Sequence, residues 1–414
     1  MKKILSIFLS AVLFTFALAL TGCGEADGAT KGRDYDIADI NEGVTAADSE
    51  FAFNIFRELN SEDSGNSIFI SPLSISAALT MTYNGAETTT KEVMSSTLCY
   101  NDIERKTVNL SYMNLLNYLE NVDRKIELNI ANSIWIREGE QIKEAFLSDN
   151  MNNFNARIEA LDFSDKGAAD RINKWISDAT KKKIDKMIEP PIDPNTVMFL
   201  INAIYFKGEW SDRFDPENTF DGVFHTLDGG EQNVRMMHRN GDIEYTKGSD
   251  YKAVRLPYGN GNTSMYCILP DEGKNINSFI AGMSQDKWNE ILDNITETDD
   301  VNLQIPKFKL EYGIKSLKDS LSSLGMEEAF EDRADFSGIR EGLYIDEVLH
   351  KAVIEVNEEG SEAAAATVVV LEESAAVIEP VTFIADRPFM FVIADDNTGT
   401  ILFMGKLLNI ESLN

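Results

Sequence analysis

Apolar residues recur at helical spacing in three stretches of the chain. The first stretch has its apolar positions between residues 51 and 59, which predicts a helix that begins near Asp48. The second, residues 72–83, is apolar over a broad side, as is typical of a deeply buried helix. The third, residues 168–188, has a lysine-rich outer face, and we expect it to lie on the surface as a helix.

Between these helices lie stretches rich in β-branched and aromatic residues, which predict strands. They cover residues 126–136, 197–206, 251–257, 265–269, 301–310 and 343–356. The chain ends in a predicted hairpin, residues 389–394 and 400–408, whose turn contains Gly399. Strands and helices do not alternate regularly. We therefore expect one mixed α/β domain over residues 48–414 rather than a Rossmann or barrel enzyme.

Composition and charge narrow the classes of partner. Hydrophobic residues make up 43% of the 414-residue chain, enough for a large core. Lys and Arg total 38 against 69 Asp and Glu, so the net charge is −31. Such a chain repels a phosphate backbone, and nucleic acid is not an expected partner.

The N-terminus has the pattern of an export signal. Two lysines precede an uncharged apolar run that ends in Leu20-Thr21-Gly22-Cys23, similar to the lipobox of bacterial lipoproteins. We expect residues 1–22 to be removed, Cys23 to be lipidated, and residues 23–47 to form an acidic flexible tether. The protein would then be exported and held at the membrane, or released outside the cell. The alternative is an uncleaved apolar anchor.

Chemistry-bearing residues are sparse. Cys99 and Cys267 lie in apolar segments, which favours two buried thiols over a disulfide. No Cys and His spacing predicts a metal site, no nucleotide-binding loop or nucleophile elbow occurs, and no cofactor is expected. His350 lies within a strand-like run, where a hydrogen-bonded core histidine is the common outcome. We do not expect an enzyme.

Residues 358–371 have an unusual composition, because small residues lead directly into β-formers. One interpretation is a short alanine helix followed by a strand. In the other, alternate residues from Ser361 to Leu371 share an uncharged face, and the segment is an exposed loop in one state and a central strand in another. No proline lies between Lys307 and Glu379, so nothing there interrupts a ladder of N–H groups.

Six separated motifs in sequence order resemble those of the serpin family, over residues 48–414. They are residues 66–79 with Gly85-Ala86, residues 202–210, Ile305-Pro306-Lys307-Phe308, His350-Lys351-Ala352-Val353, Glu358-Glu359-Gly360-Ser361, and residues 386–391. The resemblance implies an α+β single domain with a large five-stranded mixed sheet, two further sheets, eight to nine helices and an exposed reactive loop at about residues 358–380.

The resemblance also implies an inhibitor that works once. A serine protease attacks the loop, forms a covalent 1:1 acyl complex with a monomeric inhibitor, and is trapped when the cut loop inserts into the main sheet. A heparin-type cofactor is not expected, because Arg105 and Lys106 are the only cations between Asn101 and Glu120. The alternative is a non-inhibitory serpin that acts as a surface binding or carrier protein. The hinge departs from the inhibitory pattern only by Ser361, where Thr is usual.

Site residues follow from the motifs they match. Four match the shutter, where the sheet must part: Ser71, Ser74, Asn202 and His350. Three match the breach, where the loop first enters: Trp210, Lys307 and Glu358. The hinge comprises Glu358, Glu359, Gly360, Ser361, Glu362, Ala363, Ala364, Ala365, Ala366 and Thr367. The helix of residues 168–188 would lie across the sheet and have to move.

The position of the reactive bond decides which proteases are targets. Counting from the hinge glycine places it at Ser374-Ala375, whereas other alignments place it after Glu373 or at Val377. No Arg or Lys occurs from Glu358 to Asp386, so a trypsin-like pocket has no cationic partner. Small and aliphatic neighbours favour elastase-like or subtilisin-like proteases, with a Glu-selective protease as the competing case.

Overall fold

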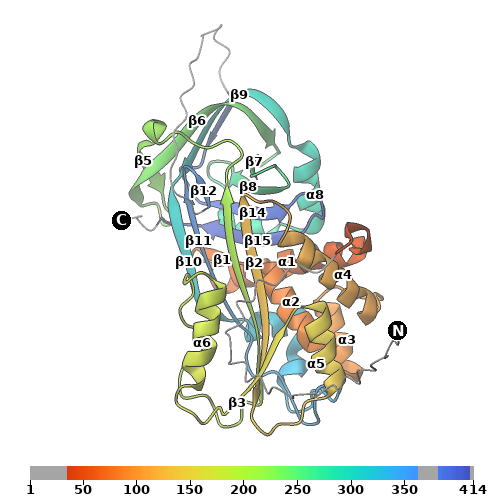
Figure 1. Ribbon diagram of the computed structural model, residues 1–414. Coiled ribbons are helices and arrows are strands. Elements are labelled where there is room, and N and C mark those ends of the chain that lie inside the picture. The colour runs from red at the N-terminus through yellow and green to blue at the C-terminus, as the bar shows by residue number, and fades with distance from the viewer. Residues whose placement is uncertain (1–34, 362–380, 411–414) are drawn as a thin grey trace, which may run out of the picture. The chain divides into compact units, whose positions relative to one another are not determined.

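The computed structural model describes residues 35–361 and 381–410 (Figure 1). The predicted signal peptide, Cys23, the hinge beyond Ser361 and the candidate reactive bonds lie outside these residues. Within them, none of the helices combines the length and the apolar character needed to cross a bilayer.

The main sheet holds the five strands expected from the resemblance and one short additional strand. In spatial order its strands are β10 (Phe308–Ser316), β11 (Leu349–Asn357), β12 (Gly360–Ser361), β4 (Met198–Glu209), β2 (Ile126–Arg137) and β3 (Arg157–Leu161). The additional strand is β12, which consists of two hinge residues and follows the turn at the end of β11. It lies between the two central strands β11 and β4.

The two further sheets are joined into one sheet of nine strands, eight of which follow one another in a continuous path. They are, in order, β1 (Ile68–Ile70), β15 (Ile401–Leu407), β14 (Phe389–Asp395), β8 (Thr263–Pro270), β7 (Tyr251–Tyr258), β6 (Glu231–Lys247), β9 (Thr296–Pro306) and β13 (Val381–Ile384), with β5 (Phe220–His225) paired to β6. The long strand β6 makes the connection, because one part pairs with β9 and β5 and the other with β7. The hairpin β14–β15 was predicted, and Gly399 in its turn has φ = 70°.

Nine α-helices occur in the described residues, and the fold expected from the resemblance is confirmed. They are α1 (Glu42–Glu62), α2 (Pro72–Tyr83), α3 (Thr88–Thr97), α4 (Arg105–Leu119), α5 (Glu144–Asn153), α6 (Ala168–Ala179), α7 (Ile276–Ala281), α8 (Gln285–Asn294) and α9 (Lys318–Leu321). α2 has the predicted bounds and contacts both β4 and β15, so it is the core element that links the two sheets.

The first predicted helix starts earlier than expected, and this corrects the end of the predicted tether. α1 begins at Glu42, because Asn41 caps it by accepting a hydrogen bond from the Val44 N–H and because Val44 and Ala47 extend its buried face. Further upstream, Tyr35 packs edge to face on Tyr118 of α4. Residues 35–47 are therefore part of the folded domain.

Two other predicted elements end differently. The helix expected over residues 168–188 stops at Ala179, because Lys181 and Lys182 adopt positive φ angles and the Thr180 hydroxyl accepts a hydrogen bond from the Ile184 N–H. The strand expected over residues 301–310 is two strands, β9 and β10, which belong to different sheets and separate at Lys307. Residues 343–348 are not a strand, and β11 begins only at Leu349.

Both cysteines of the described chain are free thiols, as predicted. Cys267 is fully buried and Cys99 only partly so.

Candidate functional site

The short strand β12 marks the point where the hinge enters the main sheet. Ser361 pairs with Val356 of β11 and with Gly208 of β4, both antiparallel. Gly360 has φ = +152°, and a Cβ there would lie 2.0 Å from the Gly208 carbonyl oxygen. Only glycine allows the chain to turn and approach β4 this closely, which explains the glycine of the Glu-Glu-Gly-Ser motif.

Three hydrogen bonds from the segment after β4 hold the turn that precedes β12. The Trp210 N–H donates to the Glu359 carbonyl at 2.9 Å, and its indole Nε1–H donates to the Asn357 carbonyl at 2.9 Å. The Phe214 N–H donates to the Glu358 carbonyl at 2.9 Å. Trp210 itself is buried. The predicted breach tryptophan therefore fixes the backbone of residues 357–359.

The predicted breach ion pair is present. Lys307 Nζ lies 2.8 Å from Glu358 Oε2, and the Thr219 hydroxyl donates to Glu358 Oε1 at 2.8 Å. Burial alone would raise the pKa of the Glu358 carboxyl. The hydrogen bonds from Lys307, the backbone and Thr219 outweigh it and hold this pKa below its ordinary value. Lys307 is the single residue between the end of β9 and the start of β10.

Ser361 has a buried partner that the sequence does not indicate. Its hydroxyl shares a hydrogen bond of 2.7 Å with the hydroxyl of Tyr258, at the end of β7. Tyr258 is fully buried and stacks on Trp210, with ring centroids 4.4 Å apart. No local pattern links Tyr258 with Ser361, or Thr219 with Glu358, because only the tertiary fold brings these residues together.

The four predicted shutter residues meet beneath the main sheet. The Ser71 N–H, at the N-cap of α2, donates to His350 Nε2 of β11 at 3.1 Å. One helical turn later, the Ser74 hydroxyl donates to Asn202 of β4. Burial lowers the pKa of His350 to about 4, so the imidazole is neutral and accepts at Nε2. α2 thus contacts both central strands of the sheet. That these contacts govern its opening stays a prediction.

The polar chain continues across the sheet to a residue that sequence reasoning missed. Asn202 Nδ2 donates to Asn132 Oδ1 of β2 at 2.7 Å, and Asn132 Nδ2 donates to the Phe154 carbonyl at 2.7 Å. The neighbouring β4 residue of the same motif, Ala203, is buried on the opposite face under α6.

The two central strands leave a space below β12. In the described part of the chain, β11 and β4 each pair with β12 and not with each other. A cavity of about 520 Å³ follows this gap and is lined by Ile75 and Leu79 of α2, by Met198 to Asn202 of β4 and by residues 342–350. The arrangement can therefore accept more chain between β4 and β11.

Helix α6 lies alongside the lower half of this sheet (Figure 1). Its apolar residues pack in one cluster with Trp135 of β2 and Ile201 of β4. Asn173 joins the helix to the segment that follows it, since its side chain accepts from the Met187 and Ile188 N–H groups at 2.9 Å. The position matches the prediction of a helix across the sheet.

Fold and site together define a class of protein in which a hinge begins a new strand inside a preformed sheet. The family model described as "Serpin (serine protease inhibitor)" matches residues 46–410. An "Uncharacterized serpin-like protein" of Methanosarcina acetivorans is 35% identical, with 98% of both chains covered. "Intracellular coagulation inhibitor 2" of Tachypleus tridentatus is also 35% identical, covering 89% of this chain and 91% of that one.

The crystal structure of a thermophilic serpin, tengpin, in the native state is similar with a TM-score of 0.80 and 33% identity, covering 91% of this chain and 96% of that one. The chain belongs to the serpin family. The description of the family names protease inhibition and no catalytic activity.

Proposed function

We propose that this serpin traps serine proteases as acyl-enzymes by inserting its cut reactive loop between β4 and β11. The observation that carries the proposal is β12. The hinge residues Gly360 and Ser361 already occupy the position of an additional strand, paired on both sides. Cleavage further along the loop would free the following residues to continue this strand.

Continuing the observed register assigns a position to each following residue. Ser361 pairs with Gly208, and because the strands are antiparallel, each further hinge residue pairs with the preceding residue of β4. Thr367 then lies opposite Asn202, and Leu371 lies opposite Met198, the first residue of β4. On the other side, Thr367 comes opposite His350. An inserted strand from Gly360 to Leu371 would be about 40 Å long and would carry an attached protease over that distance.

The same register explains the composition of the hinge. Ser361 faces Tyr258 in the core, so alternate residues up to Leu371 would face α2 and the cavity beneath the sheet. Four of these residues after Ser361 are small or β-branched: Ala363, Ala365, Thr367 and Val369. They can fill the gap without overpacking, and none brings a charge into the core.

The test is to incubate the protein with pancreatic elastase, subtilisin, a Glu-specific protease and trypsin. We expect an SDS-stable complex with elastase or subtilisin, and a new C-terminal fragment beginning at Ala375. A fragment beginning at Ser374 would favour the Glu-specific protease, and one at or next to Val377 would favour the third alignment. Cleavage by every protease without a stable complex would refute inhibition and favour a binding or carrier role. Rapid trapping of trypsin would refute the specificity.

For localisation, we propose that the protein is exported and anchored by lipid on Cys23. The proposal rests on the four residues that end at Cys23 and on the apolar run before them. Metabolic labelling with a fatty acid, followed by membrane fractionation, tests it.

A further inference from the structure

Asparagine is followed directly by glycine at three places in the chain: Asn84-Gly85, Asn240-Gly241 and Asn260-Gly261. In such a pair the backbone nitrogen of the glycine can attack the side-chain Cγ of the asparagine, because glycine has no Cβ to obstruct the approach. As the new N–Cγ bond forms, the bond from Cγ to Nδ2 breaks, and Nδ2 leaves as ammonia with the proton of the glycine N–H. Water then opens the resulting succinimide ring to aspartate or isoaspartate. The fold decides which pair reacts.

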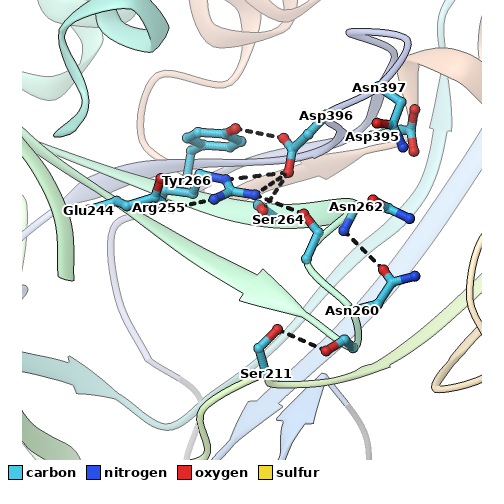
Figure 2. A network of polar contacts seen from close by, with 12 residues as sticks. Ser211, Glu244, Arg255, Asn260, Asn262, Ser264, Tyr266, Asp395, Asp396 and Asn397 are labelled. Carbon is cyan, nitrogen blue, oxygen red and sulfur yellow. Dashed lines mark hydrogen bonds and ion pairs between the residues drawn. The ribbon is translucent and has the colours of Figure 1, made fainter. Parts of the chain in front are cut away.

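Asn260 is exposed in the turn of residues 259–262 that joins β7 to β8, which we call the β7–β8 turn. The Asn262 N–H donates to Asn260 Oδ1 at 3.1 Å (Figure 2). Negative charge develops on this oxygen when Cγ is attacked, so the N–H stabilises the tetrahedral intermediate as an oxyanion hole does. Gly261 has φ = +90°, and no atom of the described residues lies within 4 Å of the position of a Cβ. The turn is therefore open to water and polarised for the reaction.

The other two pairs lack this combination. Asn84 is buried at the end of α2, and within the described chain no donor reaches its Oδ1. Asn240 is exposed, and His238 Nε2 lies 3.2 Å from its Oδ1. However, Asn240 and Gly241 are both paired with β9. Pairing in a ladder opposes the change in backbone dihedral angles that ring closure requires, so Asn240 should react more slowly than Asn260.

The β7–β8 turn also supports the segment that holds the hinge. The Gly259 N–H donates to the Glu209 carbonyl at 2.8 Å, and the Ser211 hydroxyl donates to the Gly259 carbonyl at 3.0 Å (Figure 2). Between Glu209 and Ser211 lies Trp210, whose N–H and indole are bonded to the turn of residues 357–359. A change in the backbone of the β7–β8 turn is therefore transmitted to the breach through a single short segment.

We propose that Asn260 is a site of spontaneous modification, and that isoaspartate at this position loosens the breach. Isoaspartate routes the main chain through the side-chain carboxyl carbon, which lengthens the chain by one methylene group. Gly259 and Asn262, on either side, then no longer both fit their present hydrogen bonds to Glu209 and to the Asp396 N–H. The reaction also adds a negative charge beside the Asp123 carboxylate, which accepts the Asn260 N–H.

Tryptic peptide mapping by mass spectrometry, after incubation of the purified protein at pH 8.5 and 37 °C, tests the site. The three pairs fall in three different tryptic peptides. We expect Asn260 to be converted at least fivefold faster than Asn240, and Asn84 to stay unchanged. In guanidinium chloride, where the fold is absent, the three should react at similar rates. Methyl transfer by an isoaspartyl methyltransferase identifies isoaspartate. Equal rates at Asn240 and Asn260 in the folded protein, or no conversion at Asn260, would overturn the assignment.

Hydrogen exchange tests the effect on the breach. The peptide that contains Trp210 should exchange faster in protein aged until Asn260 is converted than in fresh protein. Asn260→Gln closes the corresponding ring far more slowly and should show no such change on ageing. Asn240→Gln is the matched control and should age as the parent does. Thermal melting verifies that both variants are folded. Unchanged exchange around Trp210 after conversion of Asn260 would refute the link to the breach. No protease enters either measurement, so the outcome is independent of the proposed inhibition.

Discussion

Asp48 is a carboxyl group buried without a cation, and its replacement should change how stability depends on pH. The side chain lies in α1, where Oδ1 accepts a hydrogen bond of 2.8 Å from the Tyr112 hydroxyl of α4 and Oδ2 has no partner among the described residues. The Tyr112 hydroxyl oxygen also lies 2.8 Å from the Ser76 hydroxyl of α2 and accepts a hydrogen bond of 3.3 Å from the Tyr100 hydroxyl. Apart from Asp48, these groups are neutral hydroxyls.

Burial raises the pKa of Asp48 from 3.8 to about 7, against the smaller lowering effect of the hydrogen bonds from Tyr112 and Ser76. Below pH 3.8 the carboxyl is protonated in both folded and unfolded chains, and it has no effect on stability. Between pH 3.8 and about 7 the unfolded chain loses its proton first, so the free energy of unfolding falls as pH rises. Above about pH 7 the loss is complete.

The size of the loss follows from the difference in pKa. At 1.36 kcal/mol per pKa unit, a shift of about three units corresponds to about 4 kcal/mol as an upper limit. Asp48→Asn cannot ionise and should escape this loss. Its stability relative to the parent should therefore rise between pH 4.5 and pH 8 by about 2–4 kcal/mol, or about 3–5 °C in melting temperature for a domain of this size.

The assay is calorimetric melting of parent and variant at pH 4.5, 6, 7 and 8. Titrations common to both proteins cancel in the difference, because only residue 48 has changed. Asp39→Asn, at an exposed acid in the same N-terminal segment, is the control for the loss of one negative charge. A difference between the parent and Asp48→Asn that stays constant with pH would mean that Asp48 is ionised throughout, and the reasoning would be refuted.

Three other changes test the hinge, the breach and the lipobox. Thr367→Arg would bury an unpaired charge between Asn202 and His350, costing about 3–5 kcal/mol in the inserted state, so the loop should be cut as a substrate. Glu362→Arg, opposite the partly exposed Lys207 and Glu355, should still trap the protease, and equal trapping by both variants would show that residue 367 does not enter the sheet. Glu358→Gln removes the partner of Lys307 and should lower stability by about 1–3 kcal/mol, whereas Asp178→Asn at the exposed pair with Lys174 should cost less than about 1 kcal/mol in the same urea titration. Cys23→Ser should abolish lipid labelling and membrane retention of a folded protein; unchanged retention would indicate an uncleaved apolar anchor.

The sequence predicts those structural elements that depend on neighbouring residues, and it does not predict those that depend on contacts between distant residues. α2 was predicted with its observed bounds because the spacing of apolar residues along a helix is a local feature. The break at Lys307 was missed because residues 301–310 are β-formers throughout, and only tertiary pairing assigns the two halves to different sheets. The end of α6 depends on positive φ angles at two lysines, a conformation that lysine rarely adopts and that no sequence pattern indicates.

The residues of the candidate site also fall into two groups, those that the family motifs indicate and those that only the tertiary structure reveals. Ser71, Ser74, Asn202 and His350 could be grouped only through the family resemblance, since they lie up to 279 residues apart along the chain. Tyr258 was not found, because its contact with Ser361 depends on β7 ending directly beneath the place where β12 enters.

If the cut loop inserts as we propose, the contacts around β12 predict an order of events. The turn of residues 357–359 is bonded to Trp210 and Phe214, and Glu358 is paired with Lys307, so this end of the hinge has no need to move. Strand growth from Ser361 reaches Thr367 before Leu371, and Thr367 is the residue whose register lies between Asn202 and His350. Both side chains are bonded to α2. The step at residue 367 is therefore where the sheet and α2 must separate, and a substitution there should slow trapping more than the same substitution at Ala363.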